Sequence, residues 1–170
     1  MEIKMKKVII IGCPGAGKSY FAKKLHSLSG IPLYHLDMIW HKKDKTHISR
    51  EEFDERLKRI LQEKAWILDG NYLRTMELRV KACDTVIFFD FPYEVCMEGI
   101  YNREGKKQDD IPWEVEKADS LLLETVRNYN QAQRPHVYSL LEKYKHGKEM
   151  YIFKTREEAE KWFMEVFMQN

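Results

Sequence analysis

The sequence lacks the features that mark a membrane-spanning or secreted protein. Among its 170 residues, no apolar run approaches the length of a membrane span, and no signal-peptide-like segment follows the charged N-terminus. The three cysteines (Cys13, Cys83 and Cys96) are odd in number and widely spaced, which fits reduced thiols better than a disulfide framework. We therefore expect a cytoplasmic protein with no membrane partner.

A large charge of one sign is also absent. Lys and Arg number 29 against 27 Asp and Glu, so nucleic acid is a possible partner that the charge does not indicate. The six histidines show no recognised metal spacing. The chain contains no repeat, low-complexity segment or linker, and its length fits one domain spanning residues 1–170. The sequence leaves the oligomeric state open.

What the sequence does contain is a phosphate loop. Residues 12–19 read Gly-Cys-Pro-Gly-Ala-Gly-Lys-Ser and fit the pattern G-x-x-x-x-G-K-[ST] at every fixed position. An apolar, β-branched run at 8–11 precedes them, and apolar residues at helical spacing follow. Glycines let backbone N–H groups turn toward an anion, and the helix N-terminus attracts it. We predict that ATP, or another nucleoside triphosphate, binds the loop residues Gly12, Cys13, Pro14, Gly15, Ala16, Gly17, Lys18 and Ser19.

Three predicted strands are followed by an aspartate, namely Asp37, Asp69 and Asp90. Ligands of open α/β sheets bind at the carboxyl ends of the strands, and an apolar strand that ends in Asp is typical of a magnesium carboxylate beside a phosphate loop. An Asp that only begins a turn or caps a helix is the alternative interpretation. We expect Lys18 to reach the β and γ phosphates and Ser19 to bind Mg²⁺.

Strand and helix signals alternate, which predicts an α/β fold: a P-loop NTPase three-layer arrangement with a five-stranded parallel sheet, helices on both faces and a helical lid. The lid covers about 93–135, and its tip at 102–110 has no apolar periodicity, so core burial cannot hold it. The predicted strands are 8–11, 33–36, 66–68, 85–89 and 150–153; the predicted helices cover 20–28, 49–63, 93–102, 113–132, 136–145 and 156–168, and 38–48 is a predicted loop.

The segment Ile-Leu-Asp-Gly-Asn-Tyr-Leu-Arg-Thr at 67–75 resembles the one that follows the third strand of adenylate-kinase-type enzymes. Through 34–37, 66–75, 85–92, 134–135 and 154–156, the chain more closely resembles bacterial proteins named for DNA topology modulation, which are related to adenylate kinases. The resemblance implies a nucleoside-monophosphate-kinase-like fold and phosphoryl transfer from ATP to a small-molecule acceptor. It leaves the acceptor open.

Matched residue by residue, the resemblance implies that Asp69 lies on the magnesium side and that Asp37 contacts the acceptor. It also implies that Arg74 holds an acceptor phosphate and that Arg103 approaches the transferred phosphoryl group, although this lid is poorer in arginine than its relatives. The predicted catalytic residues are Lys18, Arg103 and Asp37; the predicted acceptor-binding residues are Asp37, Arg74, Arg79 and Arg134; the predicted metal ligands are Ser19 and Asp69.

Several alternatives stay open at this point. A hydroxyl acceptor would use Asp37, whereas a nucleotide acceptor would use Arg74 and Arg79, and each arginine has an ordinary surface role as the competing interpretation. Trp40 and Trp113 either stack on the acceptor or pack in the core or lid. The chain could instead be an NTP-driven regulatory protein that acts on DNA, or a nucleotide-binding module with weak hydrolysis and no acceptor.

Overall fold

A five-stranded parallel sheet forms the centre of the computed structural model, which describes residues 4–168. The strand order is β2-β3-β1-β4-β5, and all four neighbouring pairs are parallel. The strands are β1 (Lys7–Gly12), β2 (Leu33–His35), β3 (Trp66–Asp69), β4 (Thr85–Phe89) and β5 (Glu149–Phe153). β1 is apolar and buried from Val8 onward because helices cover both faces of the sheet. The predicted α/β fold is confirmed.

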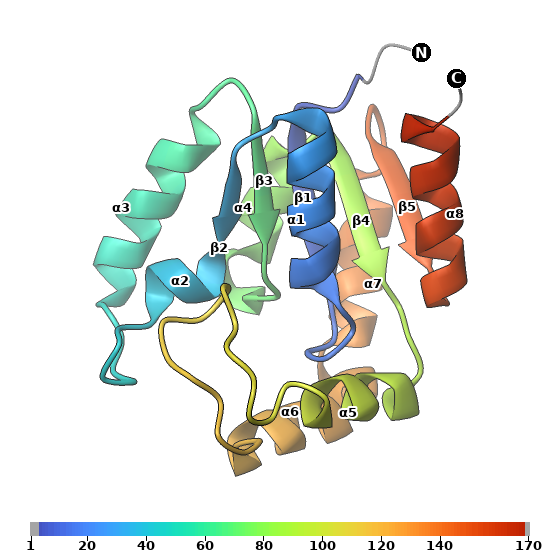
Figure 1. Ribbon diagram of the computed structural model, residues 1–170. Helices are drawn as coiled ribbons and strands as arrows, with labels where there is room; N and C mark the ends of the chain where they lie inside the picture. The colour runs from blue at the N-terminus through green and yellow to red at the C-terminus, as the bar shows by residue number, and fades with distance from the viewer. Residues whose placement is uncertain (1–3, 169–170) are drawn as a thin grey trace.

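Helices cover the sheet in two layers (Figure 1). On one face lie α1 (Lys18–Ser29) and α8 (Arg156–Phe167), and on the other lie α4 (Leu73–Ala82) and α7 (Arg134–Tyr144). Short α2 (Leu36–Trp40) and longer α3 (Arg50–Leu61) follow β2, and α5 (Tyr93–Tyr101) and α6 (Ser120–Ala132) lie together beyond the carboxyl ends of the strands. Within residues 4–168, no helix is long and apolar enough to cross a membrane.

An aromatic cluster fixes α1 to the sheet. The ring of Phe21 on α1 lies 5.0 Å from that of Phe89 at the end of β4 and 4.3 Å from that of Phe163 on α8, measured between ring centroids. All three side chains are buried. Because Phe21 lies in the first turn of α1, directly after the phosphate loop, this packing holds the start of α1 against β4.

Some boundaries differ from the predicted ones. The helix predicted from 113 begins at Ser120, because the Asp119 side chain accepts a hydrogen bond from the backbone N–H of Leu121 and caps it there. The loop predicted from 38 begins only after α2, whose Leu36 is buried. The sequence analysis did not predict α4. Ser49 caps the helix predicted from 49, because its hydroxyl accepts a hydrogen bond from the N–H of Glu52.

The segment between β4 and β5 contains α5, an irregular stretch at 102–119, and then α6 and α7. Figure 1 shows the irregular stretch leaving α5 and approaching β2 and α2 before it returns to α6. It is tied internally, since the backbone N–H of Gly105 donates to the carbonyl of Val115 over 2.8 Å. This path brings the stretch to the carboxyl ends of β2 and β3.

Candidate active site

The phosphate loop joins β1 to α1, and its glycines have positive φ angles, among them 83° at Gly15 and 97° at Gly17. A Cβ atom added at Gly15 would lie 2.1 Å from the carbonyl oxygen of Cys96 on α5, whereas one at Gly17 would meet no atom within 4 Å. One side of the loop therefore packs against α5, while the backbone at Gly17 is open.

The start of α1 has the properties of an anion site. No side chain caps the helix at Gly17, and its first turn contains no acidic residue, so the first N–H groups have no side-chain acceptor from a cap. The Lys18 ammonium group donates to the carbonyl oxygen of Cys13 over 3.0 Å and so lies across the loop. The backbone of the loop, the N-terminus of α1 and the Lys18 ammonium group thus bring positive charge to one region.

Ser19 and Asp69 lie together as the sequence analysis predicted. Ser19 Oγ is 2.7 Å from Asp69 Oδ2, and the same carboxylate oxygen is 2.6 Å from His35 Nδ1 on β2. Asp69 is buried at the end of β3. A hydroxyl and a carboxylate oxygen are the hard ligands that Mg²⁺ prefers, so this pair fits the metal. Residues 4–168 contain no group of three or more His, Cys, Asp or Glu side chains that could hold one by themselves.

Asp110 is a third member of this cluster, and the sequence analysis missed it as a site residue. Its Oδ2 lies 2.7 Å from Ser19 Oγ, and Arg103 Nη2 donates to its two carboxylate oxygens over 2.7 and 2.9 Å. Burial alone would raise the pKa of Asp110, but the charge of Arg103 and the hydrogen bond from Ser19 lower it. The only sequence signal was an acidic pair, 109–110, in the otherwise polar lid tip.

Asp37 lies in the first turn of α2 and not at the end of a strand. The hydroxyl group of Tyr72 donates to Asp37 Oδ1 over 2.6 Å. Burial raises the pKa of this carboxyl group and the charges of Asp69 and Asp110 add to the increase, while the hydrogen bond from Tyr72 and the charge of His41 oppose it. The nearby His41 has a pKa below its usual range, chiefly because of burial. Asp37 therefore lies near Asp69 and Asp110, with Tyr72 as its hydrogen-bond donor.

The two tryptophans near this region pack against histidines. The Trp40 ring stacks on that of His47, with centroids 4.3 Å apart, and the Trp113 ring lies edge-on to that of His41 at 4.9 Å. Both tryptophans are half-buried. Trp113 thus connects the irregular stretch to the end of α2.

The four arginines that the sequence analysis selected have different surroundings from one another. Arg79 is fully buried, and its Nη1 and Nη2 donate to the carbonyl oxygens of Gly70 and Tyr72 over 2.9 and 2.8 Å. We expected Arg79 to bind the phosphate acceptor. In the structure its guanidinium group instead holds the loop after β3 from within the core. The exposed Arg74 makes a two-point ion pair with Asp54 on α3, with distances of 3.0 and 2.7 Å.

Arg134 belongs to a second cluster around Asp90. Its Nε and Nη2 donate to the two carboxylate oxygens of Asp90 over 2.7 and 2.8 Å, and Tyr138 and Lys154 donate to the same carboxylate. Burial would raise the pKa of Asp90, but hydrogen bonds from these three side chains hold it well below its usual range. Asp90 thus connects the end of β4 to α7 and β5, and Arg134 is occupied here.

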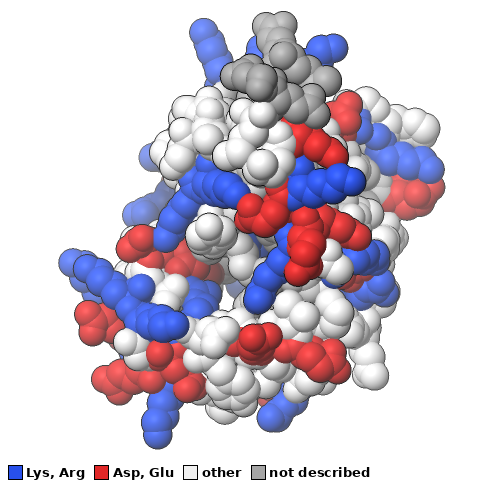
Figure 2. All heavy atoms as spheres, turned by 45° about the vertical axis from the view of Figure 1, so that its right-hand side comes forward, with Lys and Arg blue, Asp and Glu red and all other residues white. Residues whose placement is uncertain are grey.

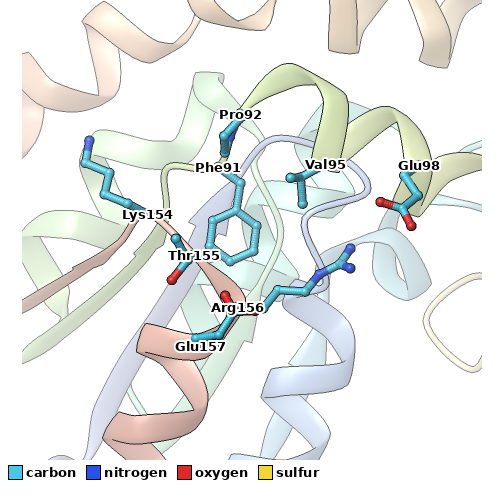
Figure 3. Close-up of a pocket in the computed structure, with 8 residues that line it drawn as sticks. All are labelled: Phe91, Pro92, Val95, Glu98, Lys154, Thr155, Arg156 and Glu157. Carbon is cyan, nitrogen blue, oxygen red and sulfur yellow. The ribbon is translucent and has the colours of Figure 1, made fainter.

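A pocket of about 210 Å³ lies between α5 and the turn from β5 to α8 (Figure 3). Its wall is apolar at Phe91 and Val95 and polar along the turn, and the Arg156 side chain extends from the start of α8 toward α5 (Figure 3). The pocket adjoins the phosphate loop through α5, whose Cys96 backs Gly15. It is lined by Phe91, Pro92, Val95, Glu98, Lys154, Thr155, Arg156 and Glu157.

Charges of both signs are interspersed on the molecular face that Figure 2 shows. Blue Lys and Arg groups alternate with red Asp and Glu groups, and neither sign forms a continuous field on this face. The formal net charge of the chain is +2. This pattern agrees with the balanced composition.

No known protein family and no curated protein matches the chain, but solved structures do. A shikimate kinase from Acinetobacter baumannii, in complex with shikimate, is similar with a TM-score of 0.53 at 16% identity, covering 98% of this chain and 96% of that chain. A gluconokinase from Sinorhizobium meliloti has a TM-score of 0.56 at 12% identity, covering 96% and 94%. A shikimate kinase from Aquifex aeolicus gives 0.52 at 17%, covering 95% and 93%. The chain therefore has the fold of small P-loop kinases of the nucleoside-monophosphate-kinase type.

Proposed function

We propose that this protein is an ATP-dependent kinase that transfers a phosphoryl group to a hydroxyl group of a small-molecule acceptor. The main support is the contact of 2.7 Å between Ser19 Oγ and Asp69 Oδ2 beside an open, uncapped phosphate loop. The structural neighbours named above are kinases by name, which is consistent with this chemistry. The comparisons do not support a role in DNA topology modulation.

The nucleotide is held by its phosphates and its base. The loop backbone from Gly12 to Ser19 and the Lys18 ammonium group bind the β and γ phosphates. Ser19 and Asp69 would hold Mg²⁺, which when bound would supply positive charge to offset that of the phosphate oxygens. The pocket between α5 and the β5–α8 turn takes the base, because Phe91 and Val95 supply an apolar wall and Thr155 and Arg156 supply polar groups.

The transfer itself depends on positioning and charge. The acceptor hydroxyl oxygen forms a bond to the γ-phosphorus, the bond from that phosphorus to the bridging β–γ oxygen breaks, and ADP leaves. Asp37 accepts the hydroxyl proton, a role that suits a carboxylate whose pKa burial has raised. Arg103, which Asp110 holds beside Ser19, stabilises charge on the transferring group with its delocalised cation.

A screen of acceptors tests this proposal. Purified protein, ATP and Mg²⁺ are incubated with nucleosides, nucleoside monophosphates, polyols, gluconate and shikimate, and mass spectrometry detects a phosphorylated product. Lys18→Ala is the matched control, since its side chain lies on the loop and not in the core. A product formed by the wild type and not by the folded Lys18→Ala variant supports a kinase. ATP hydrolysis without any phosphorylated acceptor contradicts it and favours the nucleotide-binding module.

A further inference from the structure

The hydroxyl group of Ser19 lies between two carboxylates. Ser19 Oγ is 2.7 Å from Asp69 Oδ2 and also 2.7 Å from Asp110 Oδ2, and both aspartates are buried. A serine hydroxyl carries one hydrogen, so it can donate to only one of these two oxygens. The other contact brings two oxygen atoms together without a hydrogen from Ser19 between them, and a cation is the kind of group that three such oxygens can share.

The neighbours of the two carboxylates do not supply the missing hydrogen. Arg103 Nη2 donates to the two oxygens of Asp110 over 2.7 and 2.9 Å, and His35 Nδ1, in the tautomer that has a hydrogen there, donates to Asp69 Oδ2 over 2.6 Å. These bonds leave both contacts of Ser19 as they are. The two carboxylates face one guanidinium group, so with a neutral His35 negative charge is in excess beside Ser19.

The irregular stretch buries Asp110 and leaves its neighbour Asp109 at the surface. The side chain of Asp110 is 6% exposed, whereas that of Asp109 is 72% exposed and pairs with Lys23 on α1 over 2.8 Å. A carboxylate is costly to bury unless it is paired or binds a metal. The acidic pair in the lid tip therefore divides into one solvated member and one that faces the Ser19 hydroxyl group.

We infer that Asp110 is a further magnesium ligand, which completes the site that Ser19 and Asp69 begin. The inference rests on the proposed function and deepens it, because the stretch at 102–119 then contributes to the metal site in addition to carrying Arg103. Mg²⁺ prefers an octahedral set of oxygen ligands. Three protein oxygens leave positions in that set for phosphate oxygens of the nucleotide and for water.

The magnesium contribution to nucleotide binding tests this inference. The dissociation constant of a non-hydrolysable ATP analogue is measured by calorimetry in EDTA and in saturating Mg²⁺, and the ratio of the two values gives that contribution. We expect Asp110→Asn to reduce this ratio about tenfold or more, as the loss of a partner at a metal site does. In EDTA the variant should bind the analogue at least as tightly as the wild type, because a negative charge beside the loop has been removed.

Two other variants separate a metal ligand from a structural role. Asp109→Asn removes the same charge from the adjacent, exposed residue and should leave the ratio unchanged. Arg103→Gln breaks the ion pair with Asp110 but keeps the Asp110 carboxylate, so it should not reduce the ratio. If Asp110 serves only to hold Arg103, then Asp110→Asn and Arg103→Gln reduce the ratio equally, and the inference is wrong.

A measurement on the wild type does not depend on how the variants fold. With Mn²⁺ in place of Mg²⁺ and the same analogue bound, the paramagnetic ion should broaden the amide resonances of 109–111. Resonances there that stay sharp would contradict the inference.

The outcomes distinguish this inference from the proposed function. If Asp69→Asn reduces the ratio and Asp110→Asn does not, the inference is wrong and the magnesium-dependent kinase assignment stands. If Asp110→Asn binds the analogue more tightly in both conditions, Asp110 competes with the nucleotide, and the inference is again wrong. If the wild type binds the analogue equally well in EDTA and in Mg²⁺, the proposed role of Mg²⁺ fails, and this inference fails with it.

Discussion

Gly99 on α5 provides a sharp test of how the phosphate loop is supported. A Cβ atom at this position would lie 1.9 Å from the carbonyl oxygen of Gly15 and 2.8 Å from its carbonyl carbon. Real Cβ contacts are essentially never shorter than 3.0 Å, so in Gly99→Ala the loop or the helix must move by about 1 Å. The neighbour is backbone, which cannot rotate away as a side chain would.

Two opposing effects determine how much Gly99→Ala changes the free energy of unfolding. In a helix, Gly→Ala is favourable by about 1 kcal/mol from propensity alone. Overpacking a close contact costs about 1–3 kcal/mol, so we expect Gly99→Ala to be destabilised by up to about 2 kcal/mol in spite of the better helix former. A displacement of about 1 Å at the site can lower turnover by about 10²-fold, and we expect a loss of that order.

Urea unfolding, titration with a fluorescent ATP analogue and turnover measurements check this prediction. Glu94→Ala is the control on the same helix, since Glu94 is exposed and a surface change there should alter stability by no more than about 0.5 kcal/mol. A Gly99→Ala protein that is more stable than the wild type and binds and turns over ATP normally would refute the close packing of α5 on the loop.

Three further predictions concern the charged groups. Asp69→Asn should weaken the magnesium dependence of turnover more than Asp90→Asn does, because Asp69 contacts Ser19 and Asp90 instead pairs with Arg134; identical magnesium titrations would contradict this. Asp90 has a lowered pKa in the folded protein, so it stabilises the fold above its ordinary pKa of about 3.9. That stability is lost as the pH falls, so the acid limb of a stability–pH curve should be steeper for the wild type than for Asp90→Asn. Arg103→Ala should lower kcat by about 10³-fold with little change in ATP affinity, and hydrogen exchange at 100–112 should slow when a bisubstrate-like inhibitor binds; exchange that is slow throughout and unchanged by the inhibitor would contradict a closing lid.

The sequence was sufficient for the sheet and for one part of the site. The loop pattern, the apolar strand before it and the rule that parallel strands end at one edge predicted that strand-end aspartates lie beside the loop. The resemblance to adenylate-kinase-type enzymes selected Asp69 among them, and its Oδ2 lies 2.7 Å from Ser19 Oγ. These inferences depend on spacing along the chain and on strand direction. Both are properties that a sequence carries locally.

Positions that depend on partners far along the chain could not be predicted in this way. Asp110 is 91 residues from Ser19, and nothing in its neighbourhood indicates that the irregular stretch brings it into contact. The same limit explains why helix α6 was predicted too long, since apolar spacing at 113–119 does not reveal that this part follows a different path.

The arginines show the limit most clearly, because Arg74 and Arg79 lie on one helix and have different roles. Arg79 follows Arg74 by five residues on α4, which turns the two side chains to different sides of the helix. One is fully buried and hydrogen-bonded to backbone carbonyls, and the other pairs with a carboxylate on the surface. Residue type therefore predicts that a guanidinium needs hydrogen-bond acceptors, but only the packing of α4 against its neighbours decides which acceptors it has.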